Sequence, residues 1–318
     1  MRTAAIDCGT NSIRLLIADI DDDGGLTDIV RLMRVVRLGE GVDATGRLSP
    51  AALDRTFAAT EDYAALIREH GAERIRFVAT SATRDASNRA EFVEGIRARL
   101  GIDPEVVSGD EEAVLSFAGA ASVLPSGANE TVLVVDLGGG STEFVAGNAE
   151  GVIAAHSTDM GCVRFTERFL LSDPPTEAET LEAEAEIRKM IDQAAASVPL
   201  DAATRLIGVA GSITTITAHA LALPEYQANR IHGASLPVDQ VRDAATSLLQ
   251  LSRAERARLP YMHPGRVDVI GAGALIWRTI VTRVAEAGQG RVGEAIASEH
   301  DILDGIALSA AGSAKVTP

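Results

Sequence analysis

The stretch VVDLGGGSTEF, residues 134–144, decides how the chain folds. An apolar strand ends in Asp136, three consecutive glycines make a tight turn, and a second strand begins at Thr142. Glycines in such a turn have no Cβ atom to keep an anion away, and successive backbone N–H groups can form a concave anion site. The aspartate offers the hard oxygen ligand that Mg²⁺ takes together with phosphate. This stretch therefore predicts a hairpin that binds phosphate beside a divalent cation.

A second copy of this pattern lies near the N-terminus, in AIDCGTNSIRLLI, residues 5–17. Both copies have an aspartate, a glycine two residues later, and then hydroxyl or amide side chains before the returning strand. The repetition predicts two similar domains that face each other across a cleft. The residues expected to hold phosphate oxygens in the two turns are Gly9, Thr10, Asn11, Gly138, Gly139, Gly140 and Ser141.

Strand and helix patterns alternate along the whole chain. The expected strands are Thr3–Asp7, Ser12–Asp19, Asp28–Leu38, Arg74–Ala79, Glu105–Val107, Thr131–Asp136 and Thr142–Ala146. The expected helices are Pro50–His70, Asp85–Leu100, Gly109–Ala121 and Glu177–Ala196, followed by a strand–glycine–helix unit over Leu206–Ala220. The alternation predicts two α/β domains, residues 1–122 and 123–318, each a mixed sheet flanked by helices. A hinge is expected at about 122–129.

Composition restricts the classes of function. The two cysteines cannot build a disulfide framework, and no apolar run approaches the about 20 residues of a membrane span. We therefore expect a cytoplasmic protein. A net charge of −16 argues against broad binding to nucleic acid or to membrane surfaces. Because the same charge repels polyanions, any phosphate site must be a local pocket of backbone N–H groups, a few arginines and a metal ion.

A candidate catalytic base lies in SGDEEAVLSFAG, residues 108–119. Ser108 and Glu111 fit a capping box, which gives Glu111 a structural use at the start of a helix. Glu112 is not needed for this cap and could deprotonate an attacking water. We prefer Glu112 to Glu111 as the catalytic residue, and two exposed helix glutamates are the alternative.

The predicted metal ligands are Asp136, Glu143 and Asp7. Glu143 lies on the returning strand of the glycine hairpin, where it can reach the same cation as Asp136. Arg84, in ATSATRDASN (residues 79–88), is expected to bind phosphate, because a planar guanidinium can take two oxygens at once. Arg14 follows the first turn and either reaches the cleft or pairs with a carboxylate.

These segments together resemble the exopolyphosphatase and guanosine pentaphosphate phosphohydrolase family, a branch of the actin, sugar kinase and heat-shock ATPase superfamily. The matching segments run in family order over residues 4–17, 79–88, 108–119, 134–144, 161–167, 208–216, 231–233 and 265–276. The resemblance implies two actin-like (ribonuclease H-like) domains and a last helix, at about 300–311, that packs back on the first. It also implies a homodimer, Glu112 as the base, and Mg²⁺ as cofactor, with Mn²⁺ or a monovalent cation as further candidates. The chain resembles the short form, without a C-terminal HD-type domain.

Two segments depart from the family pattern or leave their role open. SEHDILDGIAL, residues 298–308, lacks the arginine of the family's closing helix. GVAGSITTI, residues 208–216, has Ser212 where threonine is common. Its glycine at a helix start is either an anion or nucleotide site or a plain strand-to-helix turn.

The expected reaction is hydrolysis of the terminal phosphate of inorganic polyphosphate by in-line attack of water. A guanosine pentaphosphate 5′-phosphohydrolase is the alternative. The chain has no lysine-rich track, which favours short polyphosphates over long ones. Two other classes are a sensor that binds polyphosphate or an alarmone without turnover, and a kinase that holds adenosine at residues 209–216. The presence of Glu112 favours hydrolysis.

Overall fold

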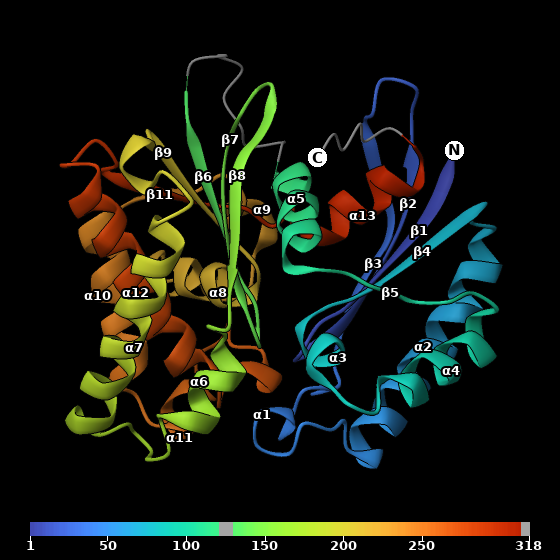
Figure 1. Ribbon diagram of the computed structural model, residues 1–318, viewed down its shortest axis with the longest axis horizontal. Helices are drawn as coiled ribbons and strands as arrows, with labels where there is room; N and C mark the ends of the chain where they lie inside the picture. The colour runs from blue at the N-terminus through green and yellow to red at the C-terminus, as the bar shows by residue number, and fades with distance from the viewer. Residues whose placement is uncertain (121–129, 313–318) are drawn as a thin grey trace. The chain divides into compact units, whose positions relative to one another are not determined.

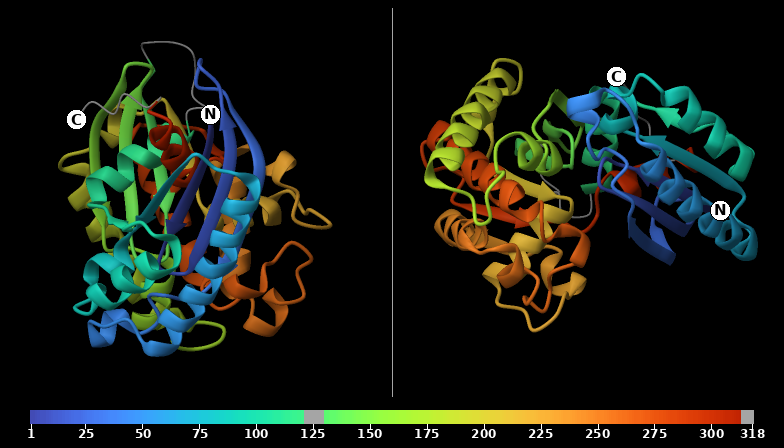
Figure 2. Two further views of the ribbon diagram at one scale, coloured as in Figure 1. Left: turned by 90° about the vertical axis from the view of Figure 1, so that its right-hand side faces the viewer. Right: turned by 90° about the horizontal axis from the view of Figure 1, so that it is seen from below.

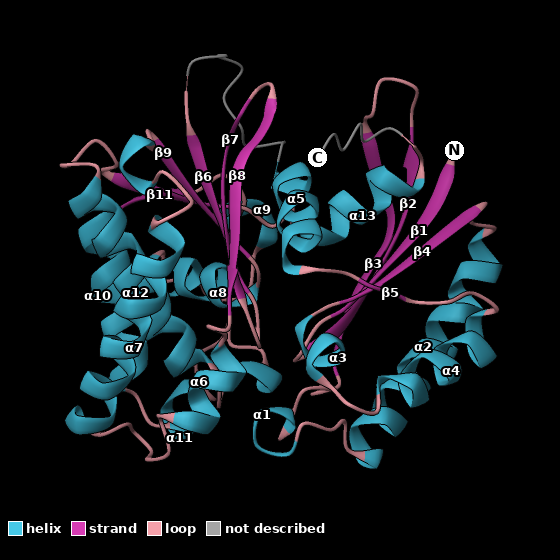
Figure 3. Cartoon of the chain, viewed as in Figure 1, coloured by secondary structure: helices cyan, strands magenta, loops and turns pink. Residues whose placement is uncertain are grey.

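The computed structural model describes residues 1–120 and 130–312, and the chain divides into two compact units. Unit 1 contains Met1–Gly119 together with Asp301–Pro318, and unit 2 contains Ala120–His300. Each unit has a mixed sheet flanked by helices (Figure 1, Figure 3). The predicted α/β class with two mixed sheets is confirmed. The hinge predicted at 122–129 lies outside the described residues.

Unit 1 has a five-stranded sheet in the order β3-β2-β1-β4-β5. The first three strands are antiparallel, and β4 and β5 run parallel to β1. The strands are β1 (Arg2–Cys8), β2 (Ser12–Ile20), β3 (Leu26–Val35), β4 (Arg74–Ala79) and β5 (Glu105–Val106). The helices are α1 (Val42–Thr45), α2 (Pro50–His70), α3 (Ser81–Asp85), α4 (Arg89–Leu100), α5 (Gly109–Gly119) and α13 (Ile302–Ala310).

The alternation of side chains along β1 determines what lies on each face of this sheet. Ile6 and Cys8 pack into the core that contains α2 and α4, whereas Ala5 packs into a second core with α5 and α13. The helices accordingly cover both faces of the unit 1 sheet (Figure 2). Asp7 alternates in step with Ala5, so its carboxylate projects towards the side of α5 and α13.

The C-terminal helix α13 belongs to unit 1, where it packs on α5 and β1. Two glycines allow this close approach: a Cβ on Gly119 would lie 1.7 Å from the carbonyl oxygen of Asp301, and one on Gly305 would lie 2.0 Å from that of Leu115. Leu303, in the segment that departs from the family pattern, is 1% exposed and lies in the core with α5. A side chain at this position therefore contributes to packing within unit 1.

Unit 2 has a six-stranded sheet in the order β10-β11-β9-β6-β7-β8. Its strands are β6 (Val132–Leu137), β7 (Thr142–Asn148), β8 (Gly151–Thr158), β9 (Arg205–Val209), β10 (Ser235–Pro237) and β11 (Glu294–Ala297). Its α-helices are α6 (Cys162–Arg168), α7 (Glu177–Ala195), α8 (Gly211–Ala220), α9 (Ala228–Ile231), α10 (Val238–Gln250), α11 (Arg253–Arg256) and α12 (Ile270–Ala287). As in unit 1, a three-stranded antiparallel meander is extended by a strand parallel to the first.

Three elements differ from the prediction. The helix expected over Asp85–Leu100 begins only at Arg89, as α4, and Asp85 is instead the last residue of α3. The two helices are separate because Ala86 is extended, and the Asn88 amide accepts from Leu48 N–H and donates to the Leu48 carbonyl. The third strand ends at Val35, before Arg37, whose φ of 51° is left-handed. β8 was not predicted, because its central Ala154 and Ala155 carry little strand preference.

Candidate active site

Both predicted turns are closed in the same way. In unit 1 the N–H of Gly9 donates to the carbonyl of Ser12 at 3.0 Å, and in unit 2 the N–H of Gly138 donates to that of Ser141 at 3.0 Å. Each turn joins the first strand of its sheet to the second. The internal repeat that the sequence indicates is thus a repeat of backbone geometry.

The aspartates that precede the two turns have different partners across the hairpin. Asp136 on β6 stands directly opposite Glu143 on β7, and Asp7 on β1 stands directly opposite Arg14 on β2. Side chains of directly opposed residues lie on the same face of a sheet, with Cβ atoms about 5 Å apart. The unit 2 hairpin therefore presents two carboxylates on one face, and the unit 1 hairpin presents a carboxylate and a guanidinium.

The unit 2 pair has the character of a cation site. Asp136 is 5% exposed and Glu143 is fully buried, and one oxygen of Glu143 accepts a hydrogen bond from Ser157 on β8 at 2.7 Å. Two buried carboxylates on one face repel each other unless a cation or a proton lies between them. Within residues 1–120 and 130–312, no three His, Cys, Asp or Glu side chains gather as a complete metal site. Mg²⁺ is usually held in proteins by one or two carboxylates together with substrate phosphate and water.

In unit 1 the carboxylate of Asp7 binds Arg14, with the arginine Nε 2.8 Å from Asp7 Oδ2. Arg14 also binds Asp301, the N-cap residue of α13. Of the two roles considered for Arg14, the structure shows the pairing with a carboxylate. Burial raises the pKa of Asp7, and the charge of Arg14 opposes that rise. Asp136 and Glu143 lie together within unit 2. Asp7 belongs to unit 1, and its role as a metal ligand stays a prediction.

The first turn has its carbonyl groups fixed by the loop that follows β3. Gly39 N–H donates to the carbonyl of Thr10 at 2.8 Å, and the N–H groups of Val36 and Arg37 donate to that of Asn11. Thr10 Oγ1 is buried and makes no hydrogen bond within the described part of the chain. A buried hydroxyl without a partner is rare unless a ligand completes it. This observation fits the predicted contact between Thr10 and phosphate.

The predicted base and the predicted phosphate-binding arginine contact each other. Arg84 Nη1 lies 3.1 Å from Glu112 Oε2 and donates to the carbonyl of Val107 at 3.0 Å. Glu112 is 8% exposed, at the first turn of α5. Ser108 Oγ caps the helix by accepting from the N–H of Glu111 at 3.2 Å, while the Glu111 carboxylate pairs with Arg76. Glu111 thus has a structural use, and the catalytic role of Glu112 stays a prediction.

Two residues that sequence reasoning assigned no role contact the glycine turn of unit 2. Gly161, the N-cap of α6, lies so close that a Cβ there would be 2.2 Å from the carbonyl oxygen of Gly139. Arg164 donates its Nε–H to the carbonyl of Gly140 at 2.9 Å. The segment GCVRFTE, residues 161–167, was the available signal, but its sequence does not show which turn it contacts.

Comparison with known proteins identifies the family. A family model for the Ppx/GppA phosphatase family matches residues 16–310. The chain belongs to the Ppx/GppA phosphatase family. It is 49% identical over 319 residues to a protein of Mycobacterium tuberculosis named Exopolyphosphatase 2, covering 98% of this chain and 99% of that relative. The family resemblance stated from the sequence is confirmed.

Two solved structures support this membership of the Ppx/GppA family. The crystal structure of an exopolyphosphatase-like protein matches with a TM-score of 0.93 at 44% identity and covers 97% of both chains. The Ppx/GppA enzyme of Aquifex aeolicus matches with a TM-score of 0.80 at 32% identity, covering 97% of this chain and 99% of that chain. This Ppx/GppA chain thus shares its fold with both structures over 97% of its length.

The GVAGSITTI segment of this Ppx/GppA chain forms β9 and α8, as predicted. Val209 pairs with Asp136 on the parallel strand β6, so the start of α8 lies at the same edge of the sheet as the acidic pair. The guanidinium of Arg266 lies against Gly211, the first residue of α8, and donates to Thr215 Oγ1 at 3.1 Å. Arg266 was not predicted as a site residue. A cation at a helix N-terminus adds to the positive potential there.

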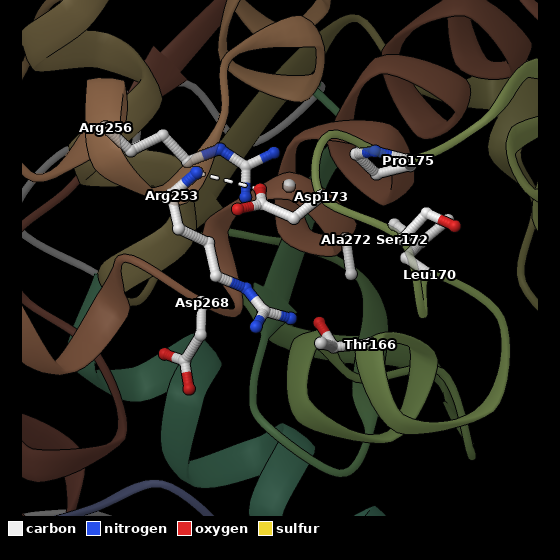
Figure 4. A pocket seen from close by; sticks show the side chains of 10 residues that line it. Thr166, Leu170, Ser172, Asp173, Pro175, Arg253, Arg256, Asp268 and Ala272 are labelled. Atoms are coloured by element: carbon white, nitrogen blue, oxygen red, sulfur yellow. Dashed lines mark hydrogen bonds between the residues drawn. The ribbon is translucent and has the colours of Figure 1, made fainter.

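A separate hollow of about 10 Å³ lies between α6, α11 and the start of α12 (Figure 4). It is lined by Thr166, Asp173, Arg256 and Asp268 among others, and it holds one water at most. Arg256 is 2% exposed, and burial lowers its pKa. The volume is too small for a phosphate ester, so we assign this hollow to the support of α11.

No helix in the described ranges is long and apolar enough to cross a membrane.

Proposed function

We propose that the protein is a magnesium-dependent exopolyphosphatase that releases terminal phosphate from inorganic polyphosphate. The observation that carries the proposal is the cross-strand pair of buried carboxylates, Asp136 and Glu143, beside a turn of three glycines. The naming of a relative with 49% identity as an exopolyphosphatase supports the choice of substrate.

The proposal gives each group a physical task. Mg²⁺, held by Asp136 and Glu143, would neutralise phosphate charge and so make the terminal phosphorus more electrophilic. Backbone N–H groups of Gly138–Ser141 and of Gly9–Asn11 would bind phosphate oxygens. Arg84 would bind a phosphate oxygen with the guanidinium donors that its contacts with Val107 and Glu112 leave unused.

Glu112 is the proposed general base. A water oxygen attacks the terminal phosphorus, the bond from that phosphorus to the bridging oxygen breaks, and the water proton passes to the Glu112 carboxylate. The shortened chain leaves on the bridging oxygen, and no covalent enzyme intermediate forms. That the groups of both units act on one substrate is part of the proposal.

We propose short chains as the preferred substrates. Arginines of this chain are mostly paired with acids, as Arg76 is with Glu105 and Glu111. Arginines that are paired with acids have fewer donors left for the phosphates of a long polyanion. Equal kcat/KM for long and short polyphosphate, at matched concentrations of chain ends, would contradict this preference.

The test compares phosphate release from short-chain polyphosphate and from guanosine pentaphosphate by the wild type, Glu112→Gln and Glu111→Gln. We expect Glu112→Gln to lower kcat by about 10²–10⁴-fold while polyphosphate still binds. Glu111→Gln, which loses only the ion pair with Arg76, should keep nearly full activity. Faster release from guanosine pentaphosphate would favour the nucleotide phosphohydrolase. Binding without turnover by the wild type would make the protein a sensor.

A further inference from the structure

Three successive carbonyl groups of the unit 2 turn are held by one short segment, residues 161–164. Cys162 N–H donates to the carbonyl of Gly138 at 3.0 Å. The N–H groups of Val163 and Arg164 donate to that of Gly139, at 2.9 and 3.2 Å. The third carbonyl, of Gly140, accepts instead from the side chain of Arg164, at 2.9 Å.

Fixing a carbonyl group also fixes the N–H group of the next residue. In a planar trans peptide these two groups point in opposite directions, and the only cis bond in the described ranges is Asp173–Pro174. Because the three carbonyls point towards α6, the N–H groups of Gly139, Gly140 and Ser141 point away from it. Successive N–H groups with one orientation form an anion-binding concavity.

The acidic pair lies on the same side as these N–H groups. Val135 and Leu137 belong to the core that also contains residues of α6. Asp136, between them on β6, must project from the opposite face, and Glu143 shares that face as its cross-strand partner. The N–H groups and the carboxylates therefore both face the side away from α6.

We infer that Arg164 is a positioning residue: its Nε–H orients the Gly140–Ser141 peptide so that the Ser141 N–H donates to substrate phosphate. The inference rests on the proposed function and adds a specific residue to it. The first two peptides of the turn are held by backbone groups, which no substitution of a side chain removes. The orientation of the third peptide, Gly140–Ser141, depends on the Arg164 side chain, so the hydrogen bond that orients it can be removed by mutation.

The guanidinium charge of Arg164 is a separate property from this hydrogen bond. Arg164 is 12% exposed, and its Nη2 lies 3.8 Å from the exposed carboxylate of Asp159. Two substitutions separate charge from hydrogen bond. Arg164→Gln places an amide nitrogen the same number of bonds along the side chain as arginine Nε, without the charge. Arg164→Met has similar length and neither donor nor charge.

The experiment measures kcat and KM for short-chain polyphosphate with Mg²⁺ in the wild type, Arg164→Gln, Arg164→Met and the control Arg168→Met. Arg168 is exposed on the same helix. We expect Arg164→Met to lower kcat/KM by about 10²-fold, the effect of losing one oriented donor. Arg164→Gln should recover most of that loss, Arg168→Met should match the wild type, and all four should share one melting temperature.

Three results would overturn the inference. Equal losses of kcat/KM in Arg164→Gln and Arg164→Met would show that the charge matters, and wild-type kinetics in Arg164→Met would show that the side chain is not needed. The third is a loss of kcat/KM that accompanies a lower melting temperature and that Arg164→Gln does not recover. A wild type that releases no phosphate would instead contradict the proposed function. In that case calorimetric titration with inorganic tripolyphosphate still tests the role of Arg164. Weaker binding by Arg164→Met but not by Arg164→Gln supports the positioning role, and equal binding by both variants and the wild type refutes it.

Discussion

Arg14 and Glu143 occupy equivalent positions in the two units. Each is the direct cross-strand partner of the aspartate that precedes one of the two predicted phosphate-binding turns, Asp7 in unit 1 and Asp136 in unit 2. In unit 1 the position carries a positive charge that pairs with the aspartate, and in unit 2 it carries a second negative charge. The repeated hairpin thus contains an internal ion pair in unit 1 and two carboxylates, the predicted metal ligands, in unit 2.

This difference predicts that Glu143 determines the response to Mg²⁺. Glu143→Gln keeps the size of the side chain and removes one of two negative charges from the site. We expect the Mg²⁺ concentration that gives half-maximal phosphate release to rise at least about 10-fold, because one of the two protein ligands of a weakly held cation is lost. The measurement is a Mg²⁺ titration of initial rates, with Mn²⁺ binding followed separately by electron paramagnetic resonance.

Ser157→Ala is the matched control, since it removes the hydrogen bond to Glu143 and leaves the charge. It should change the Mg²⁺ requirement much less than Glu143→Gln. If Glu143→Gln titrates with Mg²⁺ as the wild type does, the carboxylate pair is not the metal site.

The sequence predicted the parts of the site that short segments determine. The strand–aspartate–glycine pattern placed both hairpins, and Ser108 marked the start of α5, because these signals act over a few residues. Contacts between distant segments were not predicted. Arg14 reaches Asp301 across 287 positions, and Arg164 reaches Gly140 across 24, so no local period or spacing relates them. Gly161 was also missed, because its φ of −132° is ordinary and only the packing requires a glycine there.

Arg14 should stabilise unit 1 in a pH-dependent manner. Arg14→Met leaves the buried carboxylates of Asp7 and Asp301 without their shared cation, and removing one partner of a buried ion pair lowers the free energy of unfolding by about 3–5 kcal/mol. Burial already raises the pKa of Asp7 in the folded state, and loss of Arg14 raises it further. A group with a raised folded pKa stabilises the fold at low pH and loses that contribution as pH rises through the folded pKa.

The stability deficit of Arg14→Met should therefore be larger at about pH 7 than at about pH 4, near the ordinary pKa of aspartate. Urea unfolding of both proteins at the two pH values measures it. Arg2→Met is the control, because Arg2 pairs with Asp19 at the exposed end of the same two strands and should matter little. A deficit independent of pH would contradict this account.

Gly161→Ala should disturb the glycine turn without changing any polar group. The new Cβ would lie 2.2 Å from Gly139 O and 2.4 Å from Gly140 N, so the turn must move. We expect kcat/KM for polyphosphate to fall by about 10²-fold, since the N–H donors of the turn lose their orientation. Gly293→Ala, where a Cβ meets nothing within 4 Å, is the control and should keep the wild-type value. Retention of full activity in Gly161→Ala would show that the packing of α6 on the turn is not required.

Arg256 should stabilise unit 2 rather than contribute to catalysis. Its guanidinium donates to the carbonyls of Leu248 and Leu249, in the last turn of α10, at 2.9 and 3.1 Å. Carbonyls in the last turn of a helix have no partner within the helix, and a buried one costs about 1–3 kcal/mol when left unsatisfied. Arg256→Met should therefore lower the free energy of unfolding by about 3 kcal/mol, measured by urea denaturation. Arg253→Met, which removes an exposed arginine from the same short helix (Figure 4), should have little effect. The KM for polyphosphate should stay at the wild-type value in the Arg256→Met protein that is folded. An altered KM would show that the hollow beside α11 is coupled to the active site, and that Arg256 does more than stabilise unit 2.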